Sequence, residues 1–142
     1  MQGWKNIIPT EKKIEYINAL LEAGFDTIDF GSFVSAKAIR QMADTKEVIQ
    51  GIKVHDTKTK LLAIVANVRG AEEASVYNEI SYLGFPFSVS ETFQLRNTNS
   101  SIQESLAILG VAEEEWDRFL SATLLALRGW GGMPPWGSPS CS

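Results

Sequence analysis

The chain has 142 residues, of which 44% are hydrophobic and 21% are charged, and its net charge is −4. A chain of this length fits one domain with a hydrophobic core, and the composition is that of an ordinary globular protein. The negative net charge argues against binding to nucleic acid or to an anionic membrane, since both require a basic surface. A single cysteine, Cys141, excludes an internal disulfide. We therefore expect a cytoplasmic protein with no membrane span.

The first third of the chain predicts a helix, a strand and a second helix. Thr10 is expected to cap the first helix, which Gly24 ends, and Lys13 is expected on its solvent side. Residues 27–31 form a short apolar run that is typical of a buried strand. Ser35 is then expected to cap the second helix, which a polar loop follows.

The alternation of helices and strands continues up to residue 107. In chain order the sequence predicts a strand over 61–66, a helix over 69–80, a strand over 82–89, a polar loop over 91–100 and a helix from Ile102. Ser101 and Glu104 have the spacing of a capping box at the start of this last helix. Such alternation predicts an α/β fold with parallel strands. We expect Phe85, Phe87 and Phe93 in the core.

Residues 108–142 differ in character from the rest of the chain. Residues 113–127 favour another helix, and the closing segment RGWGGMPPWGSPSCS is rich in Gly, Pro and Ser. We therefore divide the chain into residues 1–107 and residues 108–142. A shifted reading frame or a rearranged gene end would produce this change of character, and so would a divergent native tail.

Three stretches of sequence carry a resemblance to a known family. They are MQGWKNIIPTEKKIEYINALLEAGFDTIDF from Met1, GSFVSAKAIRQMAD after it, and NTNSSIQESL from Asn97. Together they resemble the 3-hydroxy-3-methylglutaryl-CoA lyase family, which belongs to the metal-dependent lyases and Claisen-type synthases built on a TIM barrel. The resemblance covers residues 1–107. It implies a partial (β/α) TIM barrel of about three parallel strands with flanking helices, with the first strand and the C-terminal half missing.

The resemblance also implies an activity and one catalytic residue. The family cleaves 3-hydroxy-3-methylglutaryl-CoA into acetyl-CoA and acetoacetate, a step of leucine degradation. This reaction needs a base for the tertiary hydroxyl, a divalent metal that polarises the oxygens, and a proton for the departing enolate. Asp29 matches a family glutamate at the end of the second barrel strand, which pairs with the catalytic arginine and faces the substrate. Alternatively, Asp29 is a solvated strand-end carboxylate or caps the next helix.

Substrate-binding roles are implied for seven further positions. They are Gln2, Lys5, Ser32, Asn67, Glu91, Asn97 and Asn99. Turn or capping chemistry is an alternative explanation for the serine and for the residues at the strand ends and loops. The partner implied by the resemblance is a CoA thioester.

The resemblance does not supply a metal site. The intact family holds Mg²⁺ or Mn²⁺ with an aspartate, a His-x-His pair and an asparagine, and it has a catalytic cysteine. Only Met1 and Gln2 match the end of its Arg-Asp-x-x-Gln motif. The single histidine, His55, matches no ligand position, and Cys141 has no neighbouring base in the sequence. We therefore assign no metal ligand and expect the isolated chain to be inactive.

Two other hypotheses stay open. The chain could be a non-catalytic α/β fragment that self-associates or binds another polypeptide through open sheet edges. It could also be a relative of the isopropylmalate or homocitrate synthases, which use the same barrel. The motifs SFVS and QMAD, followed by NTNSSIQESL, favour the lyase over the synthases.

Overall fold

The computed structural model describes residue 1, residues 4–55 and residues 57–115. Its centre is a three-stranded parallel sheet in the order β1-β2-β3. The strands are β1 (Thr27–Ser32), β2 (Lys60–Ile64) and β3 (Ile80–Gly84). The helices are α1 (Thr10–Ala23), the 3₁₀ helix η1 (Arg40–Met42), α2 (Thr45–Gly51), α3 (Val68–Ser75), α4 (Glu91–Thr98) and α5 (Ile102–Glu115). The predicted α/β fold with parallel strands is confirmed.

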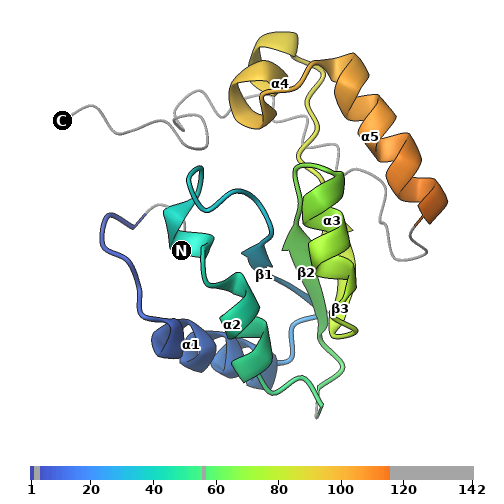
Figure 1. Cartoon of the computed structure of the whole chain (residues 1–142). Coiled ribbons are helices and arrows are strands. Elements are labelled where there is room, and N and C mark those ends of the chain that lie inside the picture. The colour runs from blue at the N-terminus through green and yellow to red at the C-terminus, as the bar shows by residue number, and fades with distance from the viewer. Residues whose placement is uncertain (2–3, 56, 116–142) are drawn as a thin grey trace.

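One face of the sheet forms the main core. Figure 1 shows α1 beside α2, α3 alongside the sheet next to β3, and α4 and α5 beyond one end of the strands. Ile28 and Phe30 of β1, Leu61 and Ala63 of β2 and Leu83 of β3 are buried in this core. Leu62, Ile64 and Tyr82 alternate with them and are only half-buried. Because side chains alternate between the faces of a strand, these three belong to the second, more open face.

The start of α1 differs from the prediction that Thr10 caps it. Pro9 occupies the cap position and provides no side-chain hydrogen bond. The Thr10 hydroxyl instead donates to Asp44 Oδ2 at 2.7 Å. The prediction that Lys13 faces solvent is also wrong, because its ammonium is 2.6 Å from Asp44 Oδ1 and its side chain is buried. A carboxylate from a distant segment therefore decides how both side chains of α1 are oriented.

The second helix begins nine residues later than expected, at Thr45 instead of directly after Ser35. The Ser35 hydroxyl accepts only a local bond from the Lys37 amide at 3.3 Å. The segment before α2 is held by tertiary contacts instead. The side-chain amide of Gln41 accepts a hydrogen bond from Ile8 N at 2.9 Å through Oε1 and donates one to the Asn6 carbonyl at 3.0 Å through Nε2. The backbone carbonyl of Gln41 accepts a hydrogen bond from the Lys13 ammonium. These contacts stabilise an irregular backbone in place of a continuous helix from Ser35.

Two boundaries in the second half are also corrected. The third helix ends at Ser75, five residues early, and β3 covers Ile80–Gly84 instead of 82–89. The segment 91–100, expected to be a polar loop, contains helix α4. The Ser90 hydroxyl accepts from Phe93 N at 3.4 Å, and Asn99 ends the helix in the left-handed region with φ of 54°. A serine cap and an acidic first turn outweigh the polarity of this segment.

A second, smaller core joins α4 and α5 to the end of the sheet. Phe85, Phe87 and Leu109 are buried there, as expected for the two phenylalanines, whereas Phe93 is 44% exposed and is not a core residue. The predicted capping box is confirmed. Ser101 N donates to Glu104 Oε2 at 2.7 Å, and Glu104 N donates to Ser101 Oγ at 3.1 Å.

Helix α5 runs without a break past residue 107 to Glu115, and most of the helix predicted over 113–127 lies outside the described residues. The division of the chain at residue 107 stays a prediction. No helix in the described part of the chain has the length and apolar character needed to cross a membrane.

Candidate functional site

The carboxyl ends of the three strands meet at one edge of the sheet. The strands are parallel, so Ser32, Ile64 and Gly84 lie in register at this edge. The loop after β1, the start of α3 and the segment leading to α4 all leave the sheet there (Figure 1). Ligands of parallel α/β sheets bind at this edge because the connecting loops gather there. The edge is therefore the candidate site.

Asp29 lies on β1 three residues before its carboxyl end, opposite Leu62 of β2. It alternates with the buried Ile28 and Phe30, which places its side chain on the open face of the sheet. The carboxyl group stays accessible, yet the surrounding protein withdraws enough water to raise its pKa to about 6, while the positive N-terminus acts in the opposite direction. A carboxyl group with such a pKa can exchange protons near neutral pH.

Ser32 is buried at the end of β1, and its polar groups connect three elements. Its hydroxyl donates to the Ile64 carbonyl of β2 at 3.2 Å, and its amide donates to Thr45 Oγ1 of α2 at 3.3 Å. The hydroxyl therefore has a structural partner. Ser32 also lines a pocket of about 550 Å³ beside this edge.

The predicted residues of the later loops have local structural contacts. Asn67 caps α3, since its Oδ1 accepts from Gly70 N at 2.9 Å. Glu91 Oε2 accepts from Ile102 N at 3.2 Å and so connects α4 to the start of α5. Asn99 is the left-handed residue that ends α4. Capping therefore accounts for the two asparagines, and substrate binding by all three residues stays a prediction.

The remaining predicted positions are less well placed by the structure. Gln2 lies outside the described residues, and Asn97 belongs to α4 but its side chain is outside the description. Lys5 is exposed in the segment before α1, next to Asn6, whose carbonyl is bound by Gln41. Substrate contacts by these three residues also stay predictions.

Two buried polar clusters escaped the sequence analysis. Lys13 and Asp44 form one of them, and the signal was present, because Lys13 has the same helical spacing as the buried Ile17 and Leu21. The other centres on Gln94, whose Oε1 accepts from Ser88 N at 2.7 Å and whose Nε2 donates to Ser105 Oγ at 2.8 Å. Gln94 was missed because the sequence analysis interpreted residues 91–100 as a polar loop.

The described residues do not fit the divalent metal of the resembling family. Among residues 1, 4–55 and 57–115, no three His, Cys, Asp or Glu side chains gather closely enough to hold a metal ion. Asp29 is a single carboxylate on its strand, whereas Mg²⁺ and Mn²⁺ take several oxygen ligands.

No family model matches the chain. A zebrafish protein described as cytoplasmic 3-hydroxy-3-methylglutaryl-CoA lyase is 41% identical over 108 residues, which are 75% of this chain and 31% of that protein. A mouse mitochondrial hydroxymethylglutaryl-CoA lyase is 40% identical over 107 residues, which are 74% of this chain and 32% of that protein.

Solved structures that resemble this chain also include a lyase of this kind. An HMG-CoA lyase from Acinetobacter baumannii, in complex with coenzyme A and 3-methylmalate, superposes with a TM-score of 0.74 and 34% sequence identity. The match covers 83% of this chain and 39% of the bacterial one. The chain belongs to the 3-hydroxy-3-methylglutaryl-CoA lyase family. It spans about a third of the length of the curated relatives it matches, and its three parallel strands with flanking helices correspond to part of the TIM barrel of these lyases.

Proposed function

We propose that this chain is the portion of a 3-hydroxy-3-methylglutaryl-CoA lyase that presents Asp29 to the substrate. The observation that carries the proposal is the position of Asp29 on β1, at the candidate ligand-binding edge of a segment that is 41% identical to a lyase. The complete enzyme would cleave 3-hydroxy-3-methylglutaryl-CoA into acetyl-CoA and acetoacetate. The relatives reported above are all lyases, which favours this activity over that of the synthases.

Of the groups that this cleavage reaction needs, the role we assign to this chain is that of one carboxylate, Asp29. A base takes the proton of the tertiary hydroxyl, the neighbouring carbon–carbon bond breaks, and the enolate of acetyl-CoA takes up a proton. In the complete enzyme a bound divalent metal would polarise the substrate oxygens, and its ligands would come from segments outside the described residues. With a pKa of about 6, Asp29 is mostly ionised at neutral pH, so it supplies negative charge to the catalytic arginine that the resemblance implies.

The test is to extend the chain with the missing segments of a relative and to measure acetoacetate release. We expect the 142-residue chain alone to show no turnover with Mg²⁺ or Mn²⁺, and the extended chain to be active. Asp29→Asn should then lower kcat strongly, because it removes a charge next to the reacting groups. Asp26→Asn is the matched control, since Asp26 is an exposed carboxylate at the opposite end of β1. Equal kcat values for the two variants would contradict the role of Asp29.

Self-association is a second candidate, and the sheet topology favours it. In the described part of the chain, β1 and β3 each pair only with β2, so each leaves one edge without a partner strand. Such an edge can recruit a strand of another molecule. Light scattering of the isolated chain at micromolar concentration should then give a mass above that of the monomer. A sharp monomeric mass would count against this candidate.

For the compartment we propose the cytoplasm. The zebrafish relative is described as cytoplasmic, which agrees with this choice, whereas the mouse relative is described as mitochondrial. Fractionation of cells that express a tagged chain would decide between the two.

A further inference from the structure

The segment that precedes α1 is held by one buried side chain. Gln41 of η1 is 3% exposed, and its amide binds this segment at two backbone groups. Oε1 accepts a hydrogen bond from Ile8 N at 2.9 Å, and Nε2 donates one to the Asn6 carbonyl at 3.0 Å. A single side-chain amide can satisfy both groups because it carries a donor and an acceptor. Gln41 thus fixes the backbone on both sides of Ile7.

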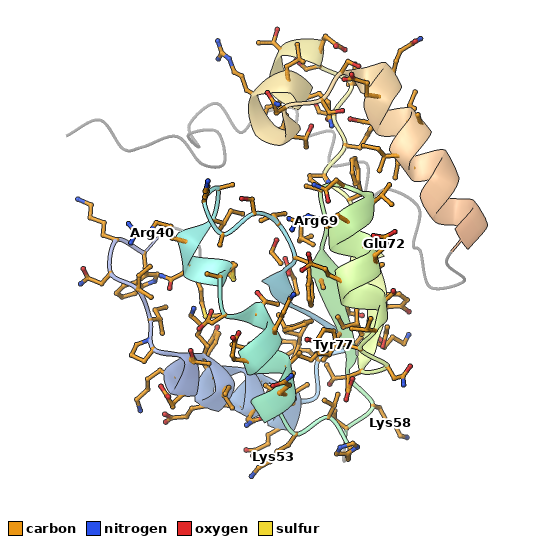
Figure 2. All side chains as sticks on the ribbon, in the orientation of Figure 1. Arg40, Lys53, Lys58, Arg69, Glu72 and Tyr77 are labelled. Carbon is orange, nitrogen blue, oxygen red and sulfur yellow. The ribbon has the colours of Figure 1, made fainter. Side chains whose placement is uncertain are left out.

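A second anchor of the same segment lies three residues further along the chain. Asp44 Oδ2 accepts from the Thr10 hydroxyl at 2.7 Å, and Asp44 Oδ1 is 2.6 Å from the buried Lys13 ammonium. The same ammonium donates to the backbone carbonyl of Gln41, which joins the two anchors. Figure 1 shows the segment before α1 beside η1, and Figure 2 labels Arg40, the neighbour of Gln41, at that place. The chain before α1 is therefore held at two points by one short stretch of the protein.

The segment held in this way leads back to the candidate site. Trp4 N donates to the Met1 carbonyl at 3.2 Å, and the side chain of Met1 packs against the main core. Withdrawal from water raises the pKa of Asp29, and the positive N-terminus opposes that rise. Because the effect of one charge on another falls off with distance, the start of the chain lies near the open face that carries Asp29. The sequence analysis places two expected substrate contacts, Gln2 and Lys5, on the same segment.

We propose that Gln41 is a positioning residue, which fixes the segment before α1 so that the start of the chain lies beside Asp29. Its burial supports this role. An apolar side chain of similar size, such as methionine, would fill the same space without the cost of withdrawing an amide from water. A buried polar group whose partners are all present instead specifies one geometry. The benefit of this geometry for catalysis rests on the proposed lyase function, whereas the placement of the start of the chain does not.

The first test uses the 142-residue chain and follows the pKa of Asp29 by NMR titration of its carboxyl carbon. Gln41→Met keeps the size of the side chain and removes both of its hydrogen bonds to the segment. The start of the chain is then released, and the pKa of Asp29 should rise, because the positive charge that opposes the rise moves away. Gln94→Met is the matched control, since Gln94 is also buried and hydrogen-bonded but belongs to the smaller core. It should lower the melting temperature and leave the pKa of Asp29 unchanged.

Acetylation of the N-terminus shows whether Gln41 acts through the start of the chain. It removes the positive charge, so it should raise the pKa of Asp29 by itself, and Gln41→Met should then have no further effect. If Gln41→Met does not fold, Ile8→Pro takes its place, because it removes the N–H that Gln41 binds and leaves Gln41 unchanged. Equal pKa values of Asp29 in Gln41→Met and Gln94→Met would overturn the proposal, as would additive effects of acetylation and Gln41→Met.

The second test measures acetoacetate release by the extended chain described above. Gln41→Met should lower kcat by up to about a hundredfold, which is what a misplacement of about 1 Å can cost. Gln94→Met should leave kcat nearly unchanged, and equal kcat values for the two variants would overturn the positioning role. An inactive extended chain with Gln41 intact would contradict the lyase function alone, because the pKa of Asp29 in the 142-residue chain is measured without turnover.

Discussion

The two cores of the molecule differ in how many apolar side chains they bury in the described part of the chain. The main core, between the sheet and helices α1, α2 and α3, consists of apolar side chains such as Leu61 and Phe30. Among the described residues, the smaller core at α4 and α5 buries three apolar side chains, Phe85, Phe87 and Leu109. The latter region relies on the hydrogen bonds of Gln94 as well as on apolar contact.

This difference predicts how each region responds when it is disturbed. Burial of many apolar groups is cooperative, so the main core should unfold as a unit. A region with few buried apolar contacts opens at a lower free energy than the rest of a protein. Helices α4 and α5 should therefore open before the sheet does.

The largest expected effect on stability comes from shortening one leucine side chain to alanine in each core. Leu61→Ala empties a fully buried position on the central strand and should lower the free energy of unfolding by about 2–5 kcal/mol. Leu109→Ala should leave the melting of the sheet nearly unchanged and speed amide exchange in α4 and α5 only. Thermal melting combined with hydrogen exchange separates the two outcomes. Equal loss of protection across the whole chain in both variants would show a single cooperative core.

Features that depend on neighbouring residues could be predicted from the sequence, whereas features that depend on distant residues could not. The parallel strands and the capping box of Ser101 and Glu104 follow from local patterns, and the structure confirms them. The late start of α2 depends on Gln41, which binds Asn6 and Ile8, more than thirty residues away in the chain. Local periodicity carries no information about such partners.

The candidate site shows the same limit. Asp29 and Ser32 were singled out from their motif, and they lie at or near the carboxyl edge of the sheet, as that motif implies. The cluster of Lys46, Arg69 and Glu73 was not found, because only the fold brings Lys46 of α2 beside Glu73 of α3. Its one local signal was the spacing of Arg69 and Glu73, which are four residues apart on one helix.

The second prediction concerns the buried ion pair of the main core. Asp44→Asn leaves the Lys13 ammonium buried, with the Gln41 carbonyl as its remaining acceptor among the residues that the structure describes. We expect a loss of about 1–3 kcal/mol in the free energy of unfolding, measured by urea denaturation at neutral pH. Glu15→Gln is the control, because the Lys12–Glu15 pair is about two-thirds exposed and its loss should change the stability far less. Equal losses would show that burial of Lys13 adds nothing.

The third prediction concerns the smaller core. Gln94→Ala removes the acceptor for Ser88 N and a donor to Ser105 Oγ, and both of these groups are buried. Leaving them without partners should cost about 1–3 kcal/mol, confined to α4 and α5. Gln103→Ala, at an exposed position of α5, is the matched control. If hydrogen exchange in α4 is the same in both variants, the amide network does not hold this region.

The smallest effect is expected at Asp29, and it should depend on pH in the direction opposite to that of Asp44. Burial tends to raise the pKa of Asp44, but hydrogen bonds from Lys13 and Thr10 outweigh it and lower the pKa. That carboxylate therefore stabilises the fold above its ordinary pKa, and this contribution is lost as the pH falls through the lowered value. Partial withdrawal from water instead raises the pKa of Asp29 from 3.8 to about 6.

For Asp29, folding thus favours the neutral form. The fold is most stable with respect to this group below pH 3.8, loses that contribution between pH 3.8 and about 6, and carries the full cost of the charge above that range. Asp29→Asn should therefore raise the melting temperature slightly at pH 8 and leave it unchanged at pH 3.5. The gain is small because the carboxyl group stays accessible to water. Asp26→Asn should show no such gain at pH 8. An equal gain in both variants would mean that the overall negative charge, and not the surroundings of Asp29, sets the effect. A gain confined to Asp29→Asn would show that the candidate site keeps a carboxylate at a cost in stability, which is expected where function requires the charge.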